Sequence, residues 1–96
     1  MNSSETDPLI RQLREQISDN YRALVEMVNK RLQLVARLKR YKESRGIGFL
    51  DPEREEWMFA YLSRANRGPL SDDGLRDLFT SLLELTKREV EDESPS

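Results

Sequence analysis

The feature that most constrains this chain is an apolar repeat that continues for roughly nine helical turns. Asp7 and Pro8 form a helix start, because Asp caps free N–H groups and Pro suits the first helical position. No Pro or Gly follows until Gly46. Apolar side chains recur at spacings of three and four: Leu9, Ile10, Leu13, Ile17, Tyr21, Leu24, Val28, Leu32, Val35 and Leu38. The pattern predicts one helix of about 37 residues, about 55 Å long.

A helix of this length has consequences for assembly. It far exceeds the mean helix of about 11–12 residues. A chain of 96 residues is too short to cover the whole apolar stripe of such a helix. The stripe must therefore pair with another chain, and we predict an intertwined homodimer.

Two shorter helices follow. Asp51-Pro52 repeats the cap-and-proline signal and predicts a helix over 52–65, after a loop at 44–50. Its expected inner face is Trp57, Met58, Tyr61, Leu62 and Ala65. Ser71, after a turn at 66–70, caps a third helix. Its expected core side is Leu75, Leu78, Phe79, Leu82, Leu83 and Thr86. The fold class is therefore all-α with three helices, and we expect one domain over 7–91 between disordered ends at 1–6 and 92–96.

The composition excludes several kinds of chemistry. The chain has no Cys and no His, so it lacks thiol nucleophiles, ordinary zinc sites and the commonest general base. We expect no metal and no cofactor. A net charge of −2 gives no basic field for nucleic acid, and no apolar run is long enough for a membrane span. The polar, acidic start MNSSETDP is unlike a signal peptide, so we expect a cytoplasmic protein.

Basic residues on the long helix are spaced for a small anionic ligand. Arg31 and Lys42 are eleven residues apart, which puts them on one face about 16 Å from each other. Their long side chains could hold a ligand about 6–8 Å across. Arg14 precedes Arg31 by seventeen residues, about 25 Å along the axis. Arg14 is therefore either a surface residue or part of a site in a second, antiparallel chain.

Asp51, Arg54 and Glu55 share one face at the start of the second helix. Each has a simple structural explanation, because Asp51 can be an N-cap, Glu55 favours the helix dipole, and Arg54 can be solvated. The six charged candidates therefore indicate a binding site only when they are considered together: Arg14, Arg31, Lys42, Asp51, Arg54 and Glu55.

As a set, the residues resemble the all-helical, type II chorismate mutase family from about Leu9 to Thr86. The segments that carry the resemblance are LREQIS, NKRLQLVARLKRYK and DPEREE, together with the GPLS turn. In order and spacing they match the family's pattern at Arg14, Arg31, Lys42, Asp51, Arg54, Glu55 and Thr86. Thr86 lies seven residues after Phe79 and replaces the more usual serine.

The resemblance implies an isomerase that rearranges chorismate to prephenate, in the shikimate pathway toward phenylalanine and tyrosine. It implies that Arg14 of the partner subunit and Arg31 clamp the two carboxylates, and that Lys42 bridges a carboxylate and the ether oxygen. It further implies that Asp51 and Glu55 hold the ring hydroxyl. Arg54 would line the pocket, and Thr86 would donate to the ring carboxylate.

Val90 departs from the family's pattern. Four residues after the hydroxyl the family usually has Gln or Glu, a second donor to the ether oxygen, where this chain has Val90. In the family's register Val90→Gln is expected to raise turnover. A distortion of the helix end could instead bring in Lys87 or Glu89. Some members of the family are activated by the first enzyme of the shikimate pathway, and Val90 makes such a partner plausible here.

Three other functions remain open at this point. A 4-amino-4-deoxychorismate mutase would keep the carboxylate clamps and differ at the ring substituent that faces Asp51 and Glu55. An isochorismate pyruvate lyase fits these acidic residues less well. A non-catalytic helical dimerisation module would share the long helix and bind no ligand.

Overall fold

The computed structural model describes residues 7–92, with side chains through residue 90, as three helices in the predicted order. The segments 1–6 and 93–96, which are expected to be disordered, lie outside the described residues. Asp92, also expected to be disordered, is instead the last residue of the third helix. Two compact units make up the chain, Met1–Gln33 and Leu34–Ser96, and their boundary falls within the first helix. Each unit is therefore described by itself.

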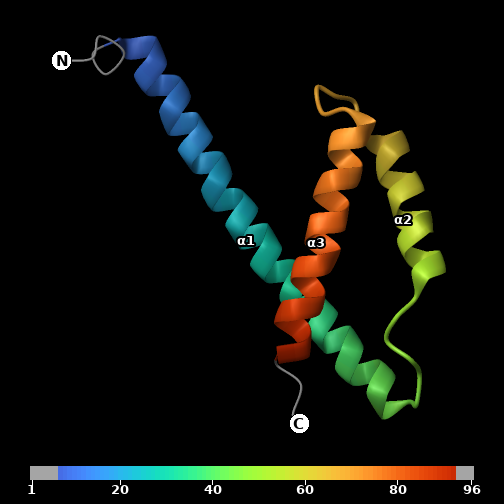
Figure 1. Cartoon of the computed structure of the whole chain (residues 1–96). Coiled ribbons are helices and arrows are strands. Elements are labelled where there is room, and N and C mark those ends of the chain that lie inside the picture. The colour runs from blue at the N-terminus through green and yellow to red at the C-terminus, as the bar shows by residue number, and fades with distance from the viewer. Residues whose placement is uncertain (1–6, 93–96) are drawn as a thin grey trace. The chain divides into compact units, whose positions relative to one another are not determined.

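The first helix, α1, spans Pro8–Ser44 and has the predicted 37 residues (Figure 1). The Asp7 carboxylate accepts hydrogen bonds from Leu9 N at 2.9 Å and Ile10 N at 3.3 Å. These bonds satisfy two N–H groups that a helix start leaves without intrahelical partners, so Asp7 is the N-cap that the sequence predicts.

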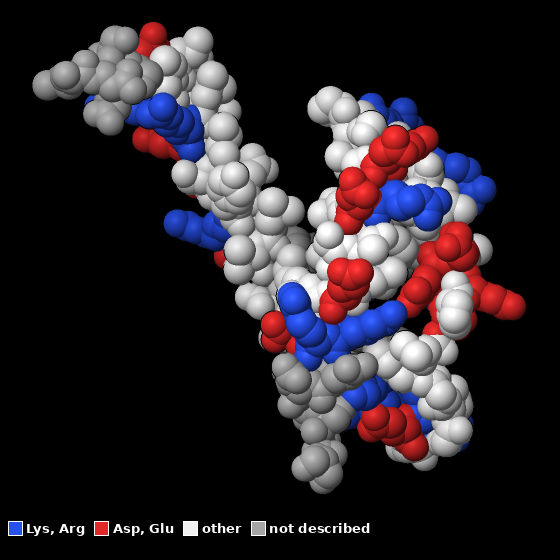
Figure 2. Space-filling model, in the orientation of Figure 1, with Lys and Arg blue, Asp and Glu red and all other residues white. Residues whose placement is uncertain are grey.

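The first unit leaves the apolar face of α1 uncovered. Leu9, Leu13, Ile17, Tyr21 and Leu24 are 61%, 47%, 53%, 67% and 60% exposed. A continuous band of uncharged side chains is visible along this part of α1 (Figure 2). Large side chains at helical spacing rarely remain in water on a stable surface, so this face is available to another chain.

In the second unit, α1 ends in a Schellman motif. Ile47 N donates to the Lys42 carbonyl at 2.8 Å, and Gly46 N donates to the Glu43 carbonyl at 3.1 Å. Gly46 has a φ of 69°, the left-handed conformation that this motif needs and that glycine adopts without strain. The motif therefore fixes the backbone of Lys42 at the point where the chain leaves the helix.

Helices α2 (Pro52–Ala65) and α3 (Asp72–Asp92) pack against each other as an antiparallel hairpin (Figure 1). Both begin with the predicted caps: Asp51 Oδ1 accepts from Arg54 N at 3.1 Å, and Ser71 Oγ accepts from Gly74 N at 3.0 Å. The turn between the helices is held by Asn66, whose amide donates to the Leu70 carbonyl at 2.8 Å. The local sequence signals thus set the bounds of all three helices.

The second unit has a small core. Ala36, Leu75 and Val90 are 7%, 8% and 3% exposed, and Thr86 is 5% exposed. The expected inner face of α2 is partly wrong for the single chain, because Trp57 and Tyr61 are 49% and 50% exposed. Leu78, expected on the core side of α3, is also exposed. Within residues 7–92, no helix combines the length and apolar character that crossing a membrane requires.

The Schellman motif predicts a contrast between two neighbouring glycines. Gly46→Ala should lower the free energy of unfolding by about 1–2 kcal/mol, because a Cβ disfavours a φ of 69°. Gly48→Ala is the matched control: a Cβ meets no atom within 4 Å at either position, but only Gly46 has a positive φ. Urea unfolding at equal protein concentration measures both. Equal shifts in the two variants would contradict the motif.

Candidate functional site

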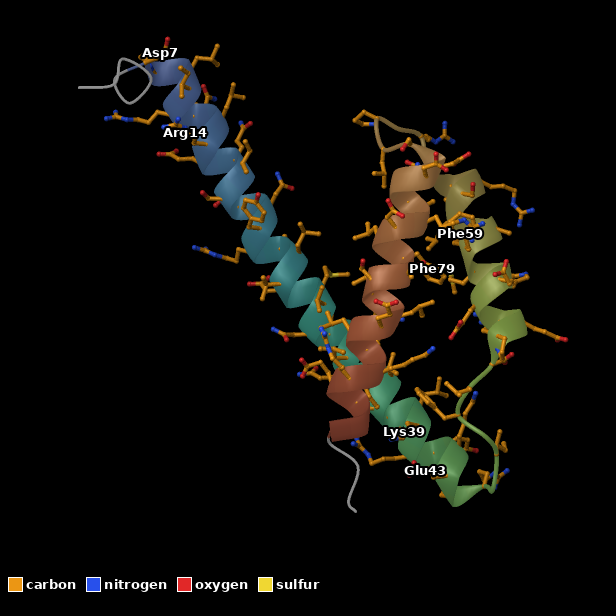
Figure 3. The ribbon with its side chains drawn as sticks, viewed as in Figure 1. Asp7, Arg14, Lys39, Glu43, Phe59 and Phe79 are labelled. Carbon is orange, nitrogen blue, oxygen red and sulfur yellow. The ribbon has the colours of Figure 1, made fainter. Side chains whose placement is uncertain are left out.

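The eight predicted site residues divide between the two units. Arg14 and Arg31 belong to the first unit, where Arg14 is exposed and extends from the side of α1 (Figure 3), and Arg31 is half-buried. The other six belong to the second unit: Lys42, Asp51, Arg54, Glu55, Thr86 and Val90. The convergence of all eight on one ligand remains a prediction.

The first turn of α2 brings three of these residues together. Asp51 accepts the Arg54 N–H through its carboxylate and the Glu55 N–H through its backbone carbonyl, both at 3.1 Å. Glu55 is half-buried, whereas Asp51 and Arg54 are exposed. One oxygen of Asp51 is thus used in the cap, and the second can still accept a hydrogen bond from a ligand hydroxyl.

Arg54 is engaged on the outer face of α2. Its guanidinium lies 4.3 Å from the centre of the Trp57 ring, in a cation–π contact. Trp57 in turn stacks on Tyr61, with ring centres 5.6 Å apart and planes 5° from parallel. This contact limits the conformations of Arg54 before any ligand binds.

Lys42 and Thr86 are two further polar candidates of the second unit. Lys42 is half-buried, with its carbonyl held by Ile47 N in the Schellman motif. Thr86 Oγ1 donates to the Leu82 carbonyl at 2.6 Å, a common arrangement for a hydroxyl within a helix. To donate to a ligand carboxylate instead, the Thr86 hydroxyl must give up this carbonyl.

Val90 lies on the same side of α3 as Thr86, one turn further on. Its side chain is only 3% exposed. An apolar side chain so enclosed offers no hydrogen bond and can act only as a wall.

A groove with a volume of about 240 Å³ lies between α2 and α3. It is lined by Glu55, Glu56, Phe59, Arg76, Phe79, Thr80, Leu83, Glu84 and Lys87. Phe59 and Phe79 point toward one another across the helix pair (Figure 3), with ring centres 6.2 Å apart. The guanidinium of Arg76 lies 4.0 Å from the centre of the Phe59 ring. Glu55 is therefore the one predicted site residue on a surface that also carries aromatic rings and cations.

The sequence prediction missed most of this groove. On α3, Thr80, Glu84 and Lys87 recur at spacings of four and three, so they share a polar flank beside the apolar face. That flank was readable from the sequence, but only the packing of α2 shows that it borders a cavity. Phe59 was missed because Trp57 and Tyr61 suggested a different inner face for α2.

The second unit contains the kinds of group that bind a small polar ligand. Lys42, Arg54, Arg76 and Lys87 supply positive charge and hydrogen-bond donors, while Asp51 and Glu55 supply acceptors. The chain contains no Cys or His, so its side chains favour orienting and polarising a ligand over attacking it covalently.

Comparisons with known proteins agree with this chemistry. The family chorismate mutase type II matches residues 13–91. The structure of chorismate mutase (form II) from Thermus thermophilus has a TM-score of 0.83 and 30% identity, covering 90% of this chain and 98% of that one. The form I structure from the same organism has a TM-score of 0.78 and 32% identity, covering 80% and 96%. No curated protein sequence matches the chain. The family match over most of the chain shows that it belongs to the chorismate mutase type II family, whose members are isomerases.

Proposed function

We propose that this chain catalyses the rearrangement of chorismate to prephenate, the step that leads toward phenylalanine and tyrosine. The observation that carries the proposal is the family match over residues 13–91. It is supported by two solved chorismate mutase structures with at least 30% identity over most of the chain. The presence of the family's charged pattern at Arg14, Arg31, Lys42, Asp51, Arg54 and Glu55 adds residue-level support.

The reaction asks little of the protein in covalent terms. Chorismate carries two carboxylates, a ring hydroxyl and an enolpyruvyl ether. In one cyclic shift of electrons, the ether C–O bond breaks while a new C–C bond forms, and no proton is gained or lost. Catalysis consists of holding the chair-like conformer and stabilising negative charge on the ether oxygen as the C–O bond breaks. A chain without Cys or His can perform it.

Each site residue takes one part of this task in the proposal. Arg31 and Arg14 of the partner subunit bind the two carboxylates, for which the planar guanidinium is well shaped. Lys42 contacts a carboxylate and the ether oxygen.

On α2 and α3 the proposed contacts concern the substrate ring. Asp51 and Glu55 accept from the ring hydroxyl, and Arg54 lines the pocket. Thr86 donates to the ring carboxylate, and Val90 forms an apolar wall.

The proposal includes a homodimer with two composite sites. Its support is the exposed face of α1 at Leu9, Leu13, Ile17, Tyr21 and Leu24, which its own chain leaves in water. A second copy of α1, running antiparallel, would bury this face and carry Arg14 to the later turns of its neighbour.

An activating partner is a further part of the proposal. The first enzyme of the shikimate pathway is the candidate, because Val90 removes a donor that the family usually has. Its support is the resemblance to family members that are activated in this way.

The first test is direct. The purified protein should convert chorismate, followed by loss of its absorbance, to a product with the same mass that is identified as prephenate. Arg31→Ala should lower kcat/KM by at least about 100-fold, because it removes a charge-assisted carboxylate contact. Rearrangement of 4-amino-4-deoxychorismate with chorismate left intact would favour the related mutase. No turnover of either substrate would favour a helical dimerisation module.

The composite site predicts complementation between two inactive chains. Arg14→Ala and Arg31→Ala homodimers should each be nearly inactive. In an equal mixture, each heterodimer has one intact site and one doubly damaged site, so activity should return to about a quarter of the wild-type value. Sedimentation of chains with different tags confirms the dimer and the subunit exchange. If exchange occurs and activity stays absent, Arg14 does not act from the partner subunit.

The burial of Val90 changes the expected result of Val90→Gln. At 3% exposure a carboxamide would be enclosed without a designed partner, which costs about 1–3 kcal/mol. We therefore expect a lower Tm and no gain in kcat. Glu89→Gln places the same carboxamide at an exposed neighbouring position and serves as the control. A rise in kcat for Val90→Gln would show that position 90 reaches the ether oxygen.

A further inference from the structure

We propose that Lys87 is a further catalytic residue, whose ammonium group donates a hydrogen bond to the ether oxygen of the substrate and replaces the donor that Val90 cannot provide. The inference rests on the proposed chorismate mutase function. It assigns a role to a residue outside the charged pattern by which the chain resembles the family.

The groove between α2 and α3 places Lys87 beside a residue of the proposed site. Glu55, the proposed acceptor for the ring hydroxyl, and Lys87 line the same cavity of about 240 Å³. The apolar part of the lining is Phe59, Phe79 and Leu83, against which a substrate ring can pack. A ligand held by Glu55 therefore has Lys87 as a neighbour on α3.

The geometry of α3 favours Lys87 over the other polar neighbour of Val90. Lys87 precedes Val90 by three residues and is rotated from it by about 60°, whereas Glu89 is rotated by about 100° in the opposite sense. Lys87 and Glu89 are both exposed, and Val90 is 3% exposed. A long, flexible lysine can cover the smaller rotation. Glu89 would bring a carboxylate, which repels the charge that develops on the ether oxygen.

The groove has few cations that could contact an anionic substrate, and Lys87 is one of them. The lining includes three carboxylates, Glu55, Glu56 and Glu84, and two cations, Arg76 and Lys87. Arg76 is stacked on the Phe59 ring at 4.0 Å. Within residues 7–90, Lys87 forms no ion pair. It is therefore the cation of the groove that can turn toward a dianionic substrate without breaking an existing contact.

The test compares four variants: Lys87→Met, Lys87→Gln, Lys87→Arg and the control Arg88→Met. Arg88 is an exposed cation on the same turn of α3 that does not line the groove. Lys87→Met and Lys87→Gln should lower kcat roughly 10- to 100-fold with a smaller change in KM, because the contact forms with charge in the transition state. The loss should be below that of an enclosed oxyanion hole, because the groove is open to water.

Two readouts separate this role from a structural one. Lys87→Arg should recover kcat to within a few-fold of wild type, and Arg88→Met should match wild type. The decrease of kcat/KM with added salt should be shallower in Lys87→Met, because one cation that faces the dianion is gone. Circular dichroism checks that each variant is helical.

The possible failures are distinguishable. If wild type converts chorismate and Lys87→Met and Lys87→Gln retain kcat within twofold, the role of Lys87 is overturned and the function stands. Equal losses in the Met, Gln and Arg variants would overturn the role of charge at this position. A wild-type protein that does not convert chorismate would overturn both proposals.

Discussion

The uncovered apolar face of α1 is the constraint on which the rest of this molecule depends. Leu9, Leu13 and Ile17 are 61%, 47% and 53% exposed, whereas the buried residues of the second unit, among those described, are Ala36, Leu75, Thr86 and Val90. Burial of apolar surface contributes about 25 cal/mol per Å², so covering the exposed face of α1 would stabilise the chain. In the proposed dimer, the surface that stabilises the fold is also the surface that delivers Arg14. Folding, assembly and substrate binding then depend on one helix.

Hydrogen bonds at the helix ends fix the backbone of the second unit where the proposed site residues Lys42 and Asp51 lie. The Schellman motif holds the carbonyl of Lys42, and the cap at Asp51 holds the N–H groups that open α2. Both rest on short sequence signals, Gly46 with its positive φ and the Asp51-Pro52 pair. The loop between them is therefore anchored at both ends by backbone hydrogen bonds. The positions of Lys42 and Asp51, which both contact the substrate in the proposal, are therefore fixed at helix ends by hydrogen bonds and not by a large buried core.

The difference between local signals and tertiary packing explains which features the sequence predicts and which it does not. Helix bounds were predictable because caps, prolines and glycines act within a few residues of themselves. The inner face of α2 was not, because a helix of 14 residues with apolar groups on several sides does not define one face. Trp57 stacks on Tyr61 in the open, and Phe59 meets Phe79 instead. The groove, and the place of Lys87 in its lining, depend on which face of α2 packs against α3. Tertiary packing decides that face.

Arg54 shows how contacts in the free chain can remain compatible with a ligand site. Its stack on Trp57, at 4.3 Å on an exposed helix face, is worth about 0.5–1 kcal/mol. A hydrogen bond to a charged group is worth about 1.5–3 kcal/mol, so a carboxylate can draw the guanidinium from the ring. The stack therefore limits the conformations of Arg54 but does not prevent Arg54 from turning toward a ligand. Limited freedom before binding reduces the entropy lost on binding. In a site that works by orienting its ligand, such weak contacts add to the stronger ones.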